Sequence, residues 1–233
     1  MGWVFLAPLV MLAVYTFVFS GVFNSRWPGS SGDGGFAFAL RLFAGLMVFN
    51  LFAETCSRAP SLIVEQPNLV KKVSFPLETL AFVSLGAALF NFFVNMGILL
   101  LGIILFEPSS LSASSLLAPL IVVPLLPFLL GLAWGLAAVG VYLRDVGTVV
   151  GMLVSVLMFL SPVFYSLSSL PVKFQFWLQW SPLAAVIEAM RAVLFGGSVH
   201  WLSVGAVLVL GVLVAAGGAA VFSILRRGFP DVL

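Results

Sequence analysis

The sequence predicts an all-α integral membrane protein with six transmembrane helices, from its composition, its hydropathy and the spacing of its apolar runs. Of the 233 residues, 62% are hydrophobic and 8% are charged, whereas a soluble domain has about 45–50% apolar and about 25% charged residues. The mean hydropathy of +1.23 leaves too little polar surface to cover a water-facing globule. These values exclude a soluble enzyme, a nucleic-acid-binding protein and a disordered chain.

Six apolar runs are long enough to form membrane spans, since a helical crossing needs about 20 mainly apolar residues. We predict that they form a single transmembrane domain covering residues 1–233. The spans are 3–23, 36–56, 77–106, 116–141, 146–164 and 201–225. The third run is longer than the hydrocarbon core is thick, so its helix must tilt, break or emerge from the bilayer. In the fourth run, Pro119, Pro124 and Pro127 predict a kinked first half.

Residues 165–200 do not fit this pattern, because they contain two prolines and only short apolar pieces. Ala184–Phe195 has about 12 residues, and apolar runs of about 10–14 residues are more typical of re-entrant or interfacial segments. Gly196 and Gly197 end this piece in the way that glycines end helices. We therefore predict two short re-entrant helices between spans five and six on the outer side, with a seventh span as the alternative.

The distribution of basic residues predicts that both termini are cytoplasmic. With that orientation the cytoplasmic segments hold six basic residues and the outer segments hold three, as the positive-inside rule requires. The cytoplasmic set is Arg58, Lys71, Lys72, Arg144, Arg226 and Arg227, and the outer set is Arg26, Lys173 and Arg191. An aromatic belt is then expected at the outer interface, formed by Trp27, Trp177, Trp180 and Trp201.

The motifs of enzyme chemistry are missing from the sequence. It contains no G-x-x-x-x-G-K-[ST] motif, so the chain cannot bind a nucleotide through a P-loop. Its single histidine, His200, and its single cysteine, Cys56, cannot form a zinc site of the usual kind. The net charge of +2 reflects a few loop cations and does not indicate a nucleic-acid partner. We predict no catalytic residue, no metal site and no cofactor in this chain, and we expect Cys56 to be a small buried residue.

Ionisable residues in or near the apolar runs lie toward the ends of the spans. A proton-coupled carrier or an ion channel would place several such groups in the middle of its spans. Glu188 and Arg191 are three residues apart, so they can pair on one helical face. Arg41 lies near the start of the second run, and we expect it to extend outward to the interface.

Three stretches of the sequence are similar to motifs of one transport family. Asn68–Glu78 reads NLVKKVSFPLE, similar to N-x-x-L-V-K-K-x-x-F-P, and Tyr142–Tyr165 contains YLRD and SPVFY, similar to Y-L-R-D…S-P-[IV]-F-Y. Leu170–Gly197 ends in SPLAAVIEAMRAVLFGG, similar to N-P-[LM]…R…[LF]-x-G, with Ser181 where Asn is common. The first span and the tail FPDVL are also similar. Over nearly its whole length the chain resembles the membrane subunit of bacterial polysaccharide and polyol-phosphate ABC exporters, the permeases for O-antigen, capsule or teichoic acid.

This resemblance implies a homodimeric channel in the bacterial inner membrane, driven by two separate ATPase subunits that bind ATP and Mg²⁺. The loop 57–76 would dock on the ATPase, and the re-entrant helices would gate the outer mouth. The residues implied in ATPase coupling are Asn68, Leu69, Val70, Lys71, Lys72, Glu78, Arg144 and Asp145. The residues expected at the channel and outer gate are Phe164, Tyr165, Phe174, Trp177, Trp180, Glu188 and Arg191.

We therefore expect the chain to be the transmembrane subunit of an ATP-driven exporter of a lipid-linked polysaccharide, whose sugar faces slide over aromatic side chains. A drug or small-molecule exporter of the same superfamily is one alternative, and a stand-alone carrier or membrane scaffold is the alternative of a different class. Family members usually begin with a cytoplasmic amphipathic helix, whereas only Met1 and Gly2 precede the first apolar run here. We expect either a truncated start or an inner gate that is built differently.

The predicted orientation can be tested by labelling single cysteines from each side of the membrane. In a Cys56→Ser background, a cysteine at position 72 should react with an impermeant maleimide only from the cytoplasm, because the positive-inside rule places that loop there. A cysteine at position 177 should react only from the outside. Labelling of position 72 from the outside would overturn the orientation.

Overall fold

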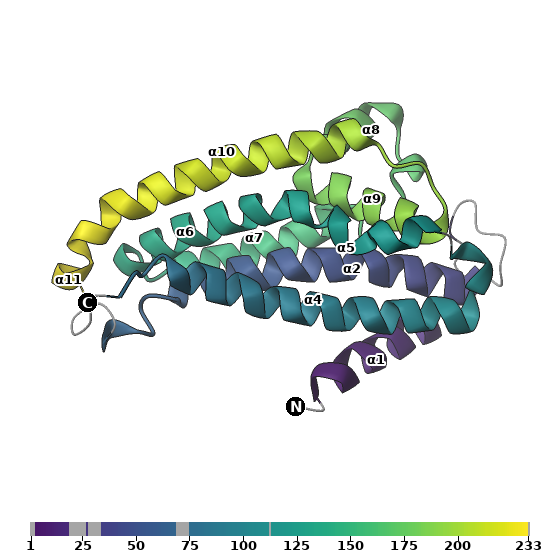
Figure 1. Ribbon diagram of the computed structural model, residues 1–233, viewed down its shortest axis with the longest axis horizontal. Coiled ribbons are helices and arrows are strands. Elements are labelled where there is room, and N and C mark those ends of the chain that lie inside the picture. Colours follow the sequence, from purple (N-terminus) through teal and green to yellow (C-terminus); the bar gives the residue numbers. More distant parts are fainter. Residues whose placement is uncertain (1–2, 19–26, 28–33, 69–74, 112, 233) are drawn as a thin grey trace. The chain divides into compact units, whose positions relative to one another are not determined.

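The computed structural model describes residues 3–18, 27, 34–68, 75–111 and 113–232. All regular secondary structure in these ranges is helical (Figure 1), so the predicted all-α class is confirmed. The longer helices are α1 (Trp3–Thr16), α2 (Gly34–Arg58), α4 (Thr79–Phe106), α6 (Leu126–Tyr142), α7 (Val146–Leu160), α9 (Pro182–Phe195) and α10 (Trp201–Leu225). The shorter ones are α5 (Ala118–Ile121), α8 (Val172–Gln179) and α11 (Phe229–Val232).

Four helical segments among the described residues are long and apolar enough to cross a membrane, which makes the chain a multi-pass membrane protein. They are Phe36–Ser61, Thr79–Phe106, Ser114–Tyr142 and Trp201–Gly228, and they correspond to the predicted spans two, three, four and six. The predicted spans one and five contain the shorter apolar helices Phe5–Thr16 and Val146–Leu160. The count of six spans and the cytoplasmic placement of both termini stay predictions.

The third and fourth spans differ in continuity. α4 is one uninterrupted helix of 28 residues, which at 1.5 Å per residue is about 42 Å long. Of the three ways to fit so long a helix to the bilayer, a break is therefore excluded. In the fourth span, a 3₁₀ turn at Val123–Leu125 separates α5 from α6. This interruption is the one that the prolines predict, because proline removes a helical hydrogen bond and clashes with the preceding turn.

α2 is the most enclosed of the four long spans. Within its most apolar stretch 83% of the residues are buried, compared with 17% for the stretch that contains α10. Cys56, near the end of α2, is buried as predicted. The large apolar side chains exposed along α4, α7 and α10 form the kind of surface that lipid covers.

The described chain divides into two compact units. Unit 1 comprises Met1–Asn50, Phe90–Val123 and Ser161–Val204, and unit 2 comprises Leu51–Leu89, Pro124–Leu160 and Gly205–Leu233. In unit 1, α9 packs against α5 and α8. In unit 2, α6 packs against α7, α11 and the 3₁₀ turn Ala59–Ser61. Unit 1 therefore contains the predicted outer region, and unit 2 contains both ends of the predicted coupling loop.

A glycine on α6 permits close contact with α10 inside unit 2. A Cβ atom at position 131 would collide with the backbone of Val214 and Ala215, and one at position 218 would collide with the backbone of Gly131. Small residues allow such close approach between membrane helices. Gly135, one turn further along α6, has open space where its Cβ would lie.

This difference predicts opposite effects for two alanine substitutions on one helix. Gly131→Ala should destabilise the permease by about 1–3 kcal/mol, because the new methyl group forces two backbones apart. Gly135→Ala is the matched control and should be neutral or slightly stabilising, since alanine is the better helix former. Thermal unfolding of the purified proteins in detergent measures the effect. Equal melting temperatures for the two variants would contradict the close contact at Gly131.

Candidate functional site

The first candidate site surrounds Arg191 on α9. α9 begins with Pro182 in its first turn and ends at Gly196, whose φ of 79° lies in the left-handed region. Both residue types suit their positions, because proline is favoured in the first turn of a helix and glycine adopts the left-handed conformation without strain. The two short helices predicted between residues 165 and 200 are thus present as α8 and α9, and their entry into the membrane stays a prediction.

The Arg191 guanidinium is buried and donates hydrogen bonds to backbone carbonyls of two separate segments. Nη1 donates to the carbonyl oxygens of Pro162 at 2.5 Å and Tyr165 at 3.4 Å, and Nη2 donates to that of Val163 at 2.6 Å. Nε donates to the carbonyl oxygen of Arg41 on α2 at 2.9 Å. The residues that follow α7 leave the helix, so their carbonyls lose their helical donors. Arg191 supplies those donors from α9.

Three neighbours complete the surroundings of Arg191. Glu188 Oε1 accepts from Nη1 at 3.0 Å, which confirms the predicted pair on one helical face. The guanidinium carbon lies 4.6 Å from the centre of the Trp27 ring, in cation–π geometry. Gly45 on α2 leaves room for the guanidinium, because a Cβ there would lie 2.5 Å from Nη2.

The structure corrects two expectations about this region. Arg41 does not extend outward, since its side chain is only 9% exposed. It forms a bidentate ion pair with Glu107, with nitrogen–oxygen distances of 3.0 and 2.9 Å. A buried guanidinium needs a counter-charge, and Glu107 provides one directly after α4. Trp27 is likewise buried rather than part of an exposed belt, because Arg191 covers one ring face. Trp177, Trp180 and Trp201 are exposed.

The aromatic residues predicted for the channel and outer gate lie around α8 and the end of α7. Phe164 and Tyr165 are half-buried in the segment whose carbonyls bind Arg191. Phe174, Trp177 and Trp180 are exposed on α8 or directly after it. Their place in a channel stays a prediction.

The second candidate site lies in unit 2, at the ends of the predicted coupling loop. Leu69, Val70, Lys71 and Lys72 lie outside the described residues. Asn68 is exposed at the edge of this gap, and Arg144 and Asp145 are exposed in the turn between α6 and α7. These positions are compatible with a protein contact, and their coupling role stays a prediction.

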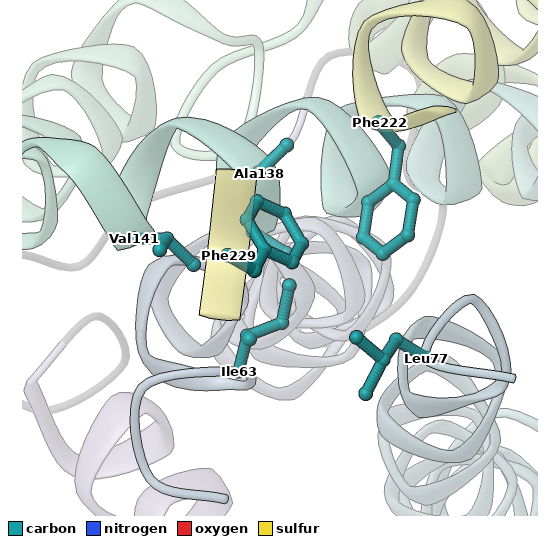
Figure 2. Packing of buried hydrophobic residues seen from close by; sticks show 7 residues of the cluster. Ile63, Leu77, Ala138, Val141, Phe222 and Phe229 are labelled. Carbon is teal, nitrogen blue, oxygen red and sulfur yellow. The ribbon is translucent and has the colours of Figure 1, made fainter. Parts of the chain in front are cut away.

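Both ends of the loop are anchored by a cluster of buried apolar side chains. Ile63 and Leu77, one from each end, pack with Phe229 of α11, which is fully buried. Figure 2 shows these side chains converging with Ala138 and Val141 of α6 and Phe222 of α10. The Phe222 and Phe229 rings meet edge to face, with their centres 5.7 Å apart. The C-terminal segment therefore holds the two loop ends together against α6.

Polar contacts reinforce the same anchor. The carboxylate of Glu78 pairs with Arg226, and its backbone carbonyl accepts from Trp134 Nε1 at 3.1 Å. Tyr142 donates its hydroxyl hydrogen to the carbonyl oxygen of Leu225 at 2.8 Å. Glu78 thus has an internal structural partner that its sequence position did not reveal. The tail motif FPDVL was the one signal that pointed to the C-terminal segment.

No group of three or more His, Cys, Asp or Glu side chains in the described ranges is placed to hold a metal ion. The chemistry available at both sites is hydrogen bonding, ion pairing and apolar packing. Such sites can position helices and contact other molecules.

Comparison with known proteins gives a match over most of the chain. The family model for the ABC-2 type transporter matches residues 2–195. The O-antigen export system permease protein RfbA of Klebsiella pneumoniae is 19% identical over 231 residues, which cover 99% of this chain and 86% of that protein. The protein of the same name from Myxococcus xanthus is 26% identical over 196 residues, covering 83% and 72% of the two chains.

The contacts of Arg191 predict unequal effects for substitutions of the two members of the Arg191–Glu188 ion pair. Arg191→Ala should lower the free energy of unfolding by about 3–5 kcal/mol, because four carbonyls lose their donor and Glu188 loses its counter-charge. The yield of folded permease should therefore fall sharply. Glu188→Gln should be mild, since the amide oxygen still accepts from Arg191. The amount of monodisperse protein extracted from membranes measures both.

Arg227→Ala, at an exposed arginine, serves as the control and should leave the yield unchanged. Adding Glu188→Gln to Arg191→Ala should not restore folding, because the carbonyls still lack a donor. Restoration by the double substitution would show that charge balance alone matters at this site.

Proposed function

The chain belongs to the ABC-2 type transporter family, and on this basis we propose that it forms the membrane pathway of an exporter for a lipid-linked polysaccharide. As a type-2 ABC permease it is a transmembrane subunit without catalysis of its own, and its family implies ABC ATPase partners. The proposed assembly is a homodimer with two ATPase subunits that bind ATP and Mg²⁺. It would carry O-antigen, capsule or teichoic acid outward across the bacterial inner membrane.

The observation that carries the substrate class is the extent of similarity to permeases named for O-antigen export. Two such proteins from different organisms align with 99% and 83% of this chain. The family match covers residues 2–195 and so includes the predicted loop, the irregular segment after α7, and the helix α9. These segments distinguish this chain from a generic bundle of membrane spans. Family membership also argues against a stand-alone carrier or scaffold.

The anchored loop supports a mechanism for coupling. α2 ends at Arg58 and α4 begins at Thr79, so the loop directly joins two spans. Its ends are fixed by Ile63 and Leu77 in the apolar cluster. A push from the ATPase on the loop would therefore move α2 and α4, because closely packed residues move together. Little of the displacement would be lost between the loop and the helices.

On the predicted outer side, aromatic side chains would form the sliding surface. Phe174, Trp177 and Trp180 are exposed on or beside α8. A flat ring offers an apolar face to the C–H face of a sugar without fixing its orientation. Contacts of this kind tolerate repeating units, as transport of a polymer requires.

Gene deletion and complementation in the native host test the proposal. Loss of the permease should abolish surface polysaccharide and leave lipid-linked glycan inside the cell, and a plasmid copy should restore export. Normal surface polysaccharide together with a new drug sensitivity would instead favour the small-molecule exporter.

A charge reversal tests the coupling loop in the same strain. Lys71→Glu with Lys72→Glu should reduce export at least about tenfold while the permease remains folded and inserted, because like charges would then oppose the docked ATPase surface. Lys173→Glu, on the predicted outer side, is the control and should export normally. Normal export and normal co-purification of the ATPase with the double variant would place the coupling contact elsewhere.

A further inference from the structure

The first candidate site borders a cavity of about 480 Å³ in unit 1, which Trp27, Arg41, Glu188 and Arg191 help to line. Residues of α8, α9 and the segment Gly196–His200 line it, together with Trp27, Arg41, Leu167, Ser168 and Ser203. We call it the outer pocket. Its volume lies in the range of about 300–1,000 Å³ that is usual for small-molecule sites.

The lining of the outer pocket is unusually polar for a chain with 8% charged residues. It includes Gln175, Gln179, Glu188, Ser198, His200 and Ser203. The side chains of Gln179, Ser198 and His200 form no hydrogen bond with another described residue. Gln175 uses only its amide nitrogen, which donates to the Leu170 carbonyl at 2.7 Å, and Glu188 uses Oε1 for Arg191. Several donors and acceptors are thus available to a ligand.

The two arginines of the pocket are already occupied. Every nitrogen of the Arg191 guanidinium donates to a carbonyl, and Nη1 also donates to Glu188. Both terminal nitrogens of Arg41 donate to Glu107. A phosphate or carboxylate entering the pocket would therefore face the negative charge of Glu188, while the terminal nitrogens of both arginines already donate to other acceptors. The site disfavours anions and suits a neutral ligand rich in hydroxyl groups.

We propose that the outer pocket binds one neutral sugar unit of the transported glycan. Each sugar hydroxyl can donate one hydrogen bond and accept others, which matches the mixed carboxylate, amide, imidazole and hydroxyl lining. This inference rests on the proposed function, which supplies the glycan. A sugar held between α8 and α9 on the predicted outer side would retain the emerging polymer between transport strokes.

Direct binding to the purified, full-length permease in lipid nanodiscs tests the pocket. The probe is the lipid-free oligosaccharide of one repeat unit, released from the host's own surface polysaccharide. Tryptophan fluorescence reports binding, because Trp27 lines the pocket. Gln179→Ala with Ser198→Ala should weaken binding roughly tenfold, since two hydrogen-bonding groups are lost.

The matched control is Ser169→Ala with Lys173→Ala, which removes a hydroxyl and a long polar side chain from residues that are exposed but do not line the cavity. It should bind the probe like the wild type. Equal affinity of the pocket variant and the wild type, absence of saturable binding, or displacement of the probe by inorganic pyrophosphate would each overturn the proposal.

Failure of the binding assay can be distinguished from failure of the complementation experiment. If the permease restores export but the pocket variant binds normally, the pocket is wrong and the proposed function stands. If the permease does not restore export, the proposed function is wrong whatever the binding result, and the pocket then loses its assigned ligand.

Discussion

Where a chain leaves a helix without access to water, its carbonyl groups need new donors. The region around α9 depends on how Arg191 provides them. α7 ends at Leu160 within an apolar stretch, and the next residues cannot satisfy their carbonyls by helical bonds. One guanidinium donates to the carbonyls of Pro162, Val163 and Tyr165. Because Arg191 belongs to α9, the same bonds hold the short helix beside the break. Without them, an irregular segment in an apolar environment would cost several kcal/mol for each unsatisfied group.

The charge of this arginine has to be balanced as well. A buried cation without a partner is strongly destabilising, whereas a paired one contributes more to specificity of arrangement than to stability. Glu188 balances Arg191, and Glu107 balances Arg41. The two pairs leave the region close to neutral, and both terminal nitrogens of Arg41 and all three nitrogens of Arg191 already donate hydrogen bonds. That neutrality is what makes the neighbouring outer pocket a site for hydroxyl groups rather than for phosphate.

The sequence predicted the features that depend on local signals. The bounds of α10 match the predicted 201–225 span, and α9 starts two residues before the predicted Ala184–Phe195, because apolar length, proline and glycine set them directly. The pair of Glu188 and Arg191 was predictable from its spacing. The pair of Arg41 and Glu107 was not, since 66 residues separate them and hydropathy does not tell which helix faces meet. For the same reason, neither the carbonyl acceptors of Arg191 nor the buried position of Trp27 could be predicted.

The two candidate sites are held together by different forces, and their expected environments explain why. Lipid tails are as apolar as leucine, so burial of apolar surface does little to hold helices together inside the membrane. Hydrogen bonds between helices contribute to the specificity of helix packing there. The Arg191 contacts follow this rule. The loop ends and α11 are predicted to meet the aqueous cytoplasm, where burying Ile63, Leu77 and Phe229 removes apolar surface from water. An apolar anchor can therefore fix the predicted coupling loop from the expected water side, which is the end where the proposed ATPase contact needs a rigid support.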